Sequence, residues 1–524
     1  RCDGAILPFV AASKSFDVIV VGSGPGGGIA TYVLCRAGLR VALVEAGKRL
    51  RPGVDFNAHW NVYEKLEERL KQGLNPVSSV WRDFAARDHF TGIGDSPGHG
   101  LLRALGGRSL CWAGHSLRFG PGDFRQWPIS YDEVKPYYDR AESFMGVHGE
   151  KNGLWNLPDG VFQKKVPIRC AERMLQIGVE RLKAKGARME FVPQRKAIPT
   201  EKHSSGRAVC HYCGHCMQGC EVDSKYTSAN TPIPRALRTG NLTLLTESTM
   251  TRILVASGRA TGIQYVDAKG EVIEIGCRAL VLACNSVETP RQLLASGVAN
   301  SSGQVGRNLM SHFGVTVIAD FPQLYSRDVS NDDGTDYYHS LLTGLYWDQP
   351  SKKFEGTYQV QCASGMLPQR LGVKDVPGFG AGFRQRLKQV NAGHANMNMQ
   401  GTTLRSAKKF VDLDTARKDR FGVPYPRVHL HYEDSDLAMA RDMVETCERV
   451  IASAGGKVWS SPGEMAASKL VIDQNHWVGT ARMGTDPKTS VVDVRGCSHD
   501  VRNLFINDAS IFPAYPEKNP TLTN

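Results

Sequence analysis

Three glycines and one acid near the start of the chain have the spacing of a nucleotide-binding loop. Gly22, Gly24 and Gly27 form the pattern G-x-G-x-x-G. In this pattern the first glycine permits a tight turn, the second admits a pyrophosphate, and the third lets a helix pack closely on a strand. Glu45 follows at close to the ~20-residue spacing of an acid that binds ribose hydroxyls. An ordinary glycine-rich turn would not explain the acid, so the pattern predicts that this segment binds a dinucleotide.

The residues around these glycines predict the elements that must position them. Residues 16–21 form a short apolar run with β-branched side chains, as expected for a buried parallel strand. Apolar residues then recur with helical spacing over 29–37, Gly38 stands where a helix would end, and 39–44 form a second apolar strand. The glycine loop is therefore predicted to join a strand to a helix, as in a Rossmann-type unit.

Four of the 13 cysteines form a cluster with the spacing C-x2-C-x2-C-x3-C. This cysteine cluster consists of Cys210, Cys213, Cys216 and Cys220. Its spacing resembles the ligand run of bacterial ferredoxins, although Glu221 replaces the usual proline. We therefore predict an iron–sulfur cluster, either 3Fe-4S or 4Fe-4S. A zinc ion that also uses His211 or His215 is one alternative, and disulfides or free thiols are another.

Six further segments, in chain order, have the signatures of a known family. They read LGGRSLCWAGHSLR (105–118), LVLACNSVETPRQLLAS (280–296), VGRNLMSHF (305–313), NHWVGTARMG (475–484), FINDASIFP (505–513) and NPTLTN (519–524). With the glycine loop, they resemble the successive motifs of the glucose–methanol–choline (GMC) oxidoreductases. The resemblance spans most of the chain and is weakest over about 325–465, which the family uses for substrate. Within the family, the cysteine cluster is most similar to that of the flavoprotein subunits of bacterial sugar and polyol dehydrogenases.

This resemblance implies FAD as the dinucleotide, and it also implies the fold. We expect an α/β chain, α+β overall, with a Rossmann-type FAD-binding domain built from non-contiguous segments and a substrate domain with an antiparallel sheet. The FAD-binding domain is expected to comprise residues 16–165, 200–325 and 465–524, and the substrate domain residues 166–199 and 326–464. Residues 1–15 are expected to be an N-terminal extension.

The resemblance places the reacting groups in the C-terminal segments. Alcohol oxidation by a flavin needs a base for the hydroxyl proton and a hydride acceptor, which is flavin N5. His476 matches the family's active-site histidine, and its ordinary pKa near 6.5 suits a base at neutral pH. Asn519 matches the second active-site position, where an amide orients the hydroxyl by hydrogen bonding. The alternatives are a hydrogen-bonded structural histidine and an asparagine that only begins a turn.

The resemblance also implies further cofactor contacts. The expected set is Gly22, Gly24, Gly27, Glu45, Gly106, Gly107, Ser109, Cys111, Asp508 and Ala509. Asp508 and Ala509 are expected near the ribityl chain and the flavin ring. Cys111 lies in the segment that faces the flavin, so it is either a packing residue or the site of a thioether bond to FAD. For Asn308 and His312, structural and active-site roles are both open.

Together these residues predict an FAD-dependent dehydrogenase that oxidises a hydroxyl of a sugar, polyol or glycoside to a carbonyl. The proton is expected to pass to His476 and the hydride to flavin N5. The resemblance implies that electrons leave through the cysteine-bound cluster to a cytochrome-type acceptor, and that a small chaperone-like subunit accompanies the chain. The alternatives are an oxidase that uses O2 and a non-catalytic flavin or electron-transfer subunit.

Composition is consistent with a large folded enzyme and argues against two classes of partner. The chain has 524 residues, and no apolar run approaches the ~18 residues of a membrane-spanning helix. The net charge is +12, but the 64 basic residues are scattered and form no nucleic-acid-binding patch. We therefore predict no transmembrane segment in this sequence and no nucleic-acid partner. The charge either assists docking to an acidic redox partner or serves solubility.

The two ends of the sequence are also informative about processing and location. Arg1 is not a methionine and no export signal follows it, so either a leader has been removed or the sequence starts late. At Asn524 the family normally continues into a final helix, so we expect the sequence to be truncated there. The resemblance favours the periplasm or its membrane surface, and the cytoplasm is the alternative.

Periodicity predicts several further elements. We expect a helix pair in 131–146 broken near Pro136, a helix at 171–186, strands in 242–283 with turns at Gly258 and Gly270, strands at 357–363, 394–404 and 426–432, and a helix from Ser435 or Asp436 to Gly455.

Overall fold

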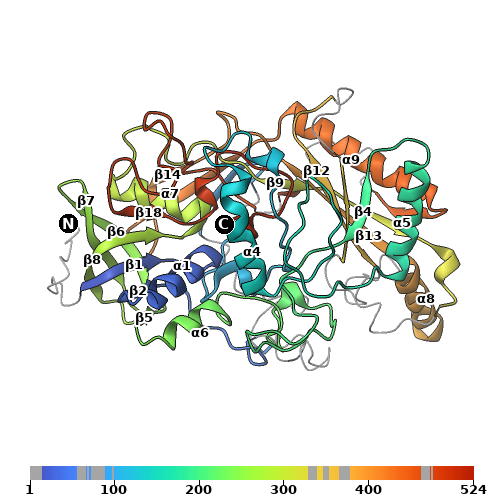
Figure 1. Cartoon of the computed structure of the whole chain (residues 1–524), viewed down its shortest axis with the longest axis horizontal. Coiled ribbons are helices and arrows are strands. Elements are labelled where there is room, and N and C mark those ends of the chain that lie inside the picture. Colours follow the sequence, from blue (N-terminus) through green and yellow to red (C-terminus); the bar gives the residue numbers. More distant parts are fainter. Residues whose placement is uncertain are drawn as a thin grey trace.

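The computed structural model describes residues 15–55, 67, 70–71, 89–96, 100–327, 339–345, 353–364, 378–461, 472–473 and 476–524. The expected N-terminal extension lies outside these residues, apart from Ser15. Two sheets lie toward opposite ends of the molecule's long axis, and the C-terminus lies between them (Figure 1).

The first sheet carries the glycine loop. Within the described residues it has seven strands in the order β5–β2–β1–β8–β7–β6, with β18 paired to β8. These strands are β1 (Ser15–Val21), β2 (Val41–Val44), β5 (Leu242–Leu245), β6 (Thr249–Ala256), β7 (Arg259–Val266), β8 (Val272–Leu282) and β18 (Leu504–Ile506). Strands β5, β2, β1, β8 and β18 are parallel, whereas β6 and β7 are antiparallel. The strands expected in 242–283 are confirmed, with Gly258 and Gly270 at positive φ in the turns.

The predicted strand–loop–helix unit is confirmed. Ile19 and Val20 in β1 are fully buried, because a central parallel strand is covered on both faces. Helix α1 (Pro25–Arg36) follows the loop and contacts α6 (Pro232–Leu237). Helix α7 (Asn285–Ser296) starts immediately after β8 and contacts β6. This arrangement places the N-termini of α1 and α7 at the carboxyl edge of the parallel strands.

The second sheet is antiparallel, as expected. Within the described residues it has eight strands, ordered β16–β10–β13–β12–β11–β4, and β9 pairs with both β13 and β17. They are β4 (Glu190–Pro193), β9 (His312–Gly314), β10 (Thr316–Asp320), β11 (Ser340–Thr343), β12 (Tyr358–Ser364), β13 (His394–Thr402), β16 (Lys457–Ser460) and β17 (Ile472–Asp473). Strands β9 and β10 belong to this sheet although they fall in a segment assigned above to the FAD-binding domain. The strands predicted at 357–363 and 394–404 correspond to β12 and β13.

Helices α5 (Cys170–Lys183) and α9 (Asp434–Ser453) cover one face of this second sheet (Figure 1). Met443 and Cys447 of α9 and Met397 and Met399 of β13 are fully buried in the core between them. Both helices were predicted. A small third sheet joins β3 (Thr91–Gly94), β14 (Phe410–Lys418) and β15 (Pro424–Leu430), and helix α8 (Gly380–Gly393) lies beside the second sheet.

The expected break at Pro136 was wrong, because α4 (Tyr131–Met145) is one helix that contains this proline. Ser130 Oγ accepts a hydrogen bond from the Glu133 amide, and the Glu133 carboxylate accepts one from the Ser130 amide. This capping box fixes the first turn. Pro136 lies in the second turn, where its ring costs one backbone hydrogen bond, and burial of Tyr138 on the same helix helps to offset that loss.

Among the described residues, no helix is long and apolar enough to cross a bilayer.

Candidate active site

The carboxyl ends of the parallel strands border a cavity of about 540 Å³. Gly22 and Gly24 line it after β1, Glu45 after β2, and Asp508 after β18. This is the edge at which open parallel sheets bind ligands. The cavity also reaches the second sheet, where Gln361 of β12 lines it. One space therefore joins the glycine loop to the antiparallel sheet.

The three glycines of the loop are required for different reasons. Gly22 has a φ of +94°, and a Cβ there would lie 2.4 Å from the Ala283 carbonyl oxygen. A Cβ on Gly27 would lie 1.9 Å from the Gly22 carbonyl oxygen. A Cβ on Gly24 would meet no protein atom within 4 Å, although Gly24 borders the cavity. Gly22 and Gly27 thus serve the protein's own packing, whereas Gly24 leaves space for a ligand. A pyrophosphate at the N-terminus of α1 fits that space.

Glu45 connects the two glycine-rich segments. Its Oε1 accepts a hydrogen bond from the Gly47 amide at 2.8 Å, and its Oε2 accepts one from the Ser23 amide at 3.1 Å. Ser23 Oγ in turn accepts a hydrogen bond from the Gly106 amide at 2.9 Å. Burial raises the pKa of Glu45. Carboxylate oxygens accept more than one donor, so a ribose hydroxyl remains compatible with this arrangement. The ribose contact itself stays a prediction.

Most of the other predicted cofactor contacts border the same cavity. Gly107, Ser109, Cys111, Asp508 and Ala509 line it, whereas Gly27 and Gly106 do not. Asp508 accepts hydrogen bonds from the Ser510 and Asn285 amides at 2.9 and 3.0 Å. Burial raises the pKa of the Cys111 thiol, which favours packing over reactivity at this cysteine. The thioether interpretation stays untested.

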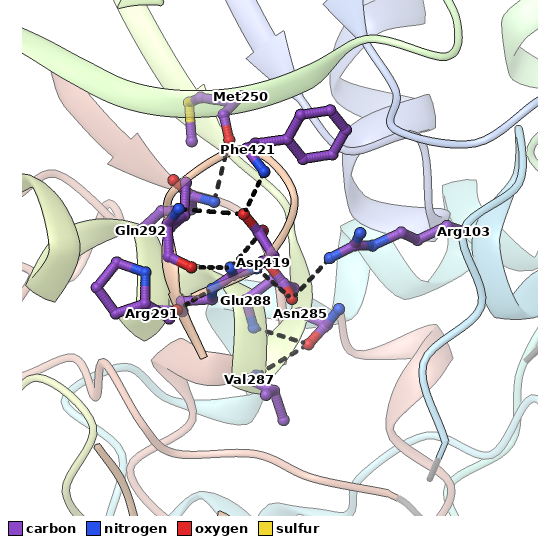
Figure 2. Close-up of polar contacts among 11 residues, drawn as sticks. Arg103, Met250, Asn285, Val287, Glu288, Arg291, Gln292, Asp419 and Phe421 are labelled. Atoms are coloured by element: carbon purple, nitrogen blue, oxygen red, sulfur yellow. Dashed lines mark hydrogen bonds and ion pairs between the residues drawn. The ribbon is translucent and has the colours of Figure 1, made fainter. Parts of the chain in front are cut away.

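Partly buried ion pairs connect α7 to Arg103 and to Asp419 (Figure 2). Arg103 Nη2 donates to Glu288 Oε1 at 3.3 Å, and Arg291 Nη1 lies 3.1 Å from Glu288 Oε2. Arg291 Nη2 donates to Asp419 Oδ2 at 2.6 Å, from the loop between β14 and β15. Burial by itself would raise the pKa of Glu288, but the two arginines outweigh it and lower that pKa. The wall formed by Glu288 is therefore fixed from two sides.

The two predicted catalytic residues both line the cavity and are joined by amide side chains. His476 Nδ1 lies 3.1 Å from His312 Nδ1, and Gln400 hydrogen-bonds to His312. Gln361 Nε2 donates to Gln400 Oε1 at 2.8 Å and to Asn519 Oδ1 at 2.9 Å. The structure thus brings His476 and Asn519 into one hydrogen-bonded network. Their catalytic roles stay predictions.

The surroundings of His476 keep its imidazole neutral. Burial lowers its pKa well below the usual value, and His312, Arg108 and His115 act in the same direction. Burial also lowers the pKa of His312, to about 3. A neutral imidazole has one unprotonated nitrogen, which can accept a proton from an alcohol.

The sequence did not identify three of the amide side chains at the site, Gln361, Asn398 and Gln400. Met397 and Met399 of β13 face the core, so the alternating residues Asn398 and Gln400 lie on the opposite face of the sheet. Asn398 lines the cavity, and so does Gln361 on the neighbouring strand. Their alternation is visible in the sequence, but it has the same pattern as a strand with one face in water. Only the sheet packing shows that this face borders a cavity.

The cysteine cluster lines a second, smaller cavity together with His211 and His215. The Tyr212 amide donates to Cys210 Sγ at 3.3 Å, and the Lys225 amide donates to Cys220 Sγ at 3.5 Å. Within the described part of the chain, no group of three or more His, Cys, Asp or Glu side chains is arranged to hold a metal ion. The four thiols therefore border one space without forming a closed ligand set.

The cysteine cluster is attached to the wall of the main cavity. Lys225 is almost fully buried, and its Nζ donates to the carbonyl oxygens of Leu110, Trp112 and Cys216 at 3.1, 2.7 and 2.5 Å. Met217, which follows Cys216, lines the main cavity itself. The two cavities are thus separated by a wall to which this loop contributes directly.

Comparison with known proteins agrees with this geometry. The chain is 28% identical to 2-methyl-1,2-propanediol dehydrogenase of Mycolicibacterium austroafricanum, over 97% of this chain and 92% of that protein. It is 26% identical to the fructose dehydrogenase large subunit of Gluconobacter japonicus, over 97% of this chain and 95% of that protein. The fold is similar to that of pyridoxine 4-oxidase from Mesorbium loti, with a TM-score of 0.64, 19% identity and coverage of 97% and 96% of the two chains.

Two family models cover more than half of the sequence. The N-terminal GMC oxidoreductase model matches residues 100–314, and the C-terminal GMC oxidoreductase model matches residues 407–524. These ranges contain the predicted catalytic residues His476 and Asn519 and the loop of Cys111. The chain therefore belongs to the GMC oxidoreductase family.

Proposed function

We propose that the chain is an FAD-dependent dehydrogenase that oxidises a hydroxyl group of a sugar, polyol or glycoside to a carbonyl. One observation carries this proposal: the loop that fits a pyrophosphate and the His476–Asn519 network line the same cavity. FAD, when bound there, supplies a hydride acceptor at N5. In the reaction the substrate carbon loses a hydride and its hydroxyl loses a proton, so that a carbonyl remains.

The chain's own residues have separate tasks in this reaction. His476 takes the hydroxyl proton, since its lowered pKa leaves one ring nitrogen unprotonated; the same lowering makes it a weaker base than the ordinary pKa near 6.5 expected from the sequence. Asn519 orients the hydroxyl, because Gln361 holds its Oδ1 and thereby fixes the direction of its amide group.

The polar wall supports a hydroxyl-rich substrate. Gln361, Asn398 and Asn519 all line the cavity, and amides both donate to and accept from hydroxyl groups. A site built from buried amides rejects an apolar substrate, which would leave these groups without partners. The named activities of the two relatives above, on fructose and on a diol, support the same substrate class.

Anaerobic stopped-flow absorbance with a panel of sugars, polyols and simple alcohols tests the proposal. We expect a polyhydroxylated substrate to bleach the flavin, and His476→Ala to slow bleaching on the order of 10²-fold. His429→Ala is the matched control, because His429 lies on β15 and pairs with Asp412 outside the cavity. If no alcohol bleaches the flavin, the non-catalytic alternative replaces this proposal. If His476→Ala reacts at the wild-type rate, the base has been assigned incorrectly.

We further propose a cytochrome-type electron acceptor and an iron–sulfur cluster held by the cysteine cluster. Four thiols border one small cavity, and their side chains would have to turn toward a common centre to bind such a cluster, which would supply a one-electron carrier. The attachment of this loop to the main cavity through Lys225 and Met217 supports the assignment. Iron and sulfide analysis and low-temperature EPR of the purified protein test it directly.

Serine variants distinguish the dehydrogenase from an oxidase. Cys213→Ser is expected to lose iron and cytochrome reduction while flavin bleaching by substrate continues. Cys497→Ser is the matched control, since Cys497 lies outside both cavities. An iron-free wild-type protein that forms hydrogen peroxide at its turnover rate would instead establish an oxidase. A periplasmic location and a small chaperone-like subunit belong to the same proposal and are tested by fractionation and co-purification.

A further inference from the structure

We propose that His312 is a positioning residue that fixes the tautomer of His476, so that Nε2 of His476 carries the lone pair that receives the substrate proton. This inference rests on the proposed function, in which His476 is the base. It adds which nitrogen of His476 acts and which residue selects it.

The first step concerns the protonation of His312. Its Nε2 lies 2.7 Å from the carbonyl oxygen of Pro516. A carbonyl oxygen only accepts hydrogen bonds, so Nε2 of His312 must carry a hydrogen. A neutral imidazole has one N–H group, and its other nitrogen is an acceptor. His312 is fully buried, which disfavours its charged form. Nδ1 of His312 is therefore an acceptor.

The second step transfers this constraint to His476. The two Nδ1 atoms lie 3.1 Å apart, which is a hydrogen-bond distance. Gln400 Nε2 approaches the same nitrogen of His312 and lies 3.5 Å from His476 Nδ1. A lone pair on His476 Nδ1 would face the lone pair of His312 Nδ1 at 3.1 Å and repel it, so the geometry favours a hydrogen on His476 Nδ1. The single hydrogen of neutral His476 is then on Nδ1, and the lone pair is on Nε2. A carbonyl oxygen of the main chain thus decides the tautomer of the proposed base through one intervening ring.

The orientation of the His312 ring follows from its contacts. A ring turned by 180° would place carbon atoms against both the Pro516 oxygen and His476. The Tyr515 ring stacks on His312 with a centroid distance of 4.1 Å and an interplanar angle of 11°. The Tyr515 hydroxyl lies 3.1 Å from His312 Nδ1, and the Gln400 amide nitrogen also approaches it. Both groups can donate, which agrees with a lone pair at Nδ1, and this one lone pair is shared among Gln400, Tyr515 and His476.

This arrangement has a chemical consequence for the base. In catalytic histidines, a partner at one ring nitrogen determines which nitrogen performs proton transfer. Here the partner is a neutral imidazole rather than a carboxylate, so it sets the tautomer without adding a negative charge beside the flavin site. Without an acceptor at Nδ1, His476 would populate the other tautomer, and its Nε2 would carry a hydrogen instead of a lone pair.

A matched pair of amide variants separates this role from simple packing. In His312→Asn the amide oxygen takes the place of Nδ1 and can accept from His476. In His312→Gln the longer side chain places its amide near the former Nε2 and leaves no acceptor at Nδ1. Both variants replace the ring by the same functional group, so their packing costs are similar. We would measure the flavin reduction rate at saturating substrate, the substrate Kd, and the tautomer of His476 by ¹H–¹⁵N NMR of histidine-labelled protein, using His476→Asn for assignment.

We expect His312→Asn to keep the Nδ1–H tautomer of His476 and to reduce the flavin within about fivefold of the wild-type rate. We expect His312→Gln to shift His476 to the Nε2–H tautomer and to lose on the order of 10²-fold in rate, with a nearly unchanged Kd. Equal rates in the two variants, or an Nε2–H tautomer in the wild-type protein, would overturn the inference. If neither variant folds, the wild-type tautomer decides the matter alone. If His476→Asn reduces the flavin normally, the proposed base is wrong, and the tautomer measurement still judges the role of His312.

Discussion

Replacing Gly24 by alanine should weaken FAD binding without harming the protein itself. Gly24 has φ −60° and ψ −173°, at the edge of the extended region that is open to alanine. The new Cβ would have no protein atom within 4 Å. Removing a glycine from the unfolded chain stabilises the folded state by about 0.4–1 kcal/mol. FAD-free Gly24→Ala should therefore be as stable as the wild-type protein or slightly more so.

The cost of Gly24→Ala should appear only when FAD binds. The Cβ would occupy the space that fits the pyrophosphate, and overpacking of this kind costs about 1–3 kcal/mol. That range corresponds to roughly a 5- to 150-fold increase in the Kd of FAD. Gly27→Ala is the contrasting variant, because its Cβ would lie 1.9 Å from the Gly22 carbonyl oxygen. It should destabilise even the FAD-free protein, by at least about 1–3 kcal/mol.

Two measurements separate these effects. Urea unfolding of the FAD-free proteins, followed by tryptophan fluorescence, gives the free energies of unfolding. Titration of the same proteins with FAD gives the Kd values. Wild-type affinity for FAD in Gly24→Ala would refute the assignment of this space to the pyrophosphate. Equal destabilisation of the FAD-free protein by the two substitutions would refute the separate roles of the glycines.

Three further predictions concern stability. As the pH falls from 7 to 5, unfolded His312 with a pKa near 6.5 takes up a proton that the folded form, with its pKa of about 3, does not. Because of this imidazole, the free energy of unfolding should fall by about 2 kcal/mol between pH 7 and pH 5. In urea unfolding, the decrease for His312→Asn over the same pH range should be smaller by that amount. Arg291→Met leaves Asp419 without its cation and Glu288 with Arg103 alone, and it should cost about 1.5–3 kcal/mol. The exposed Arg495→Met should cost less than about 1 kcal/mol in the same assay. Lys225→Met removes the donor to three backbone carbonyls and should lower the free energy of unfolding by about 1–3 kcal/mol. Wild-type stability would contradict the role of Lys225 in attaching the loop of the cysteine cluster to the wall of the main cavity.

Local patterns predicted the elements whose formation depends on nearby residues. The glycine loop between β1 and α1 was predicted from three local requirements: a tight turn, the close approach of a pyrophosphate, and the packing of a helix on a strand. Each of them requires a glycine, and all three fall within a few residues. Helix α9 and the strands of 242–283 follow from periodicity, since alternation and helical spacing need no knowledge of the partner. Pro136 was misinterpreted because its local cost is outweighed by the capping box and by burial of the rest of α4.

The sequence by itself determined the family, the dinucleotide loop, and the identity of His476 and Asn519 as candidates, because each depends on a short motif. Tertiary structure alone decided how these candidates are held. His312 reaches His476 across 164 residues of chain, and Gln361 reaches Asn519 across 158. Such contacts have no local pattern, since they arise where strands of the second sheet meet the C-terminal segments that carry His476 and Asn519. Hydrogen bonds act over about 3 Å, so only the packing of the second sheet against these C-terminal segments determines which amides and imidazoles meet.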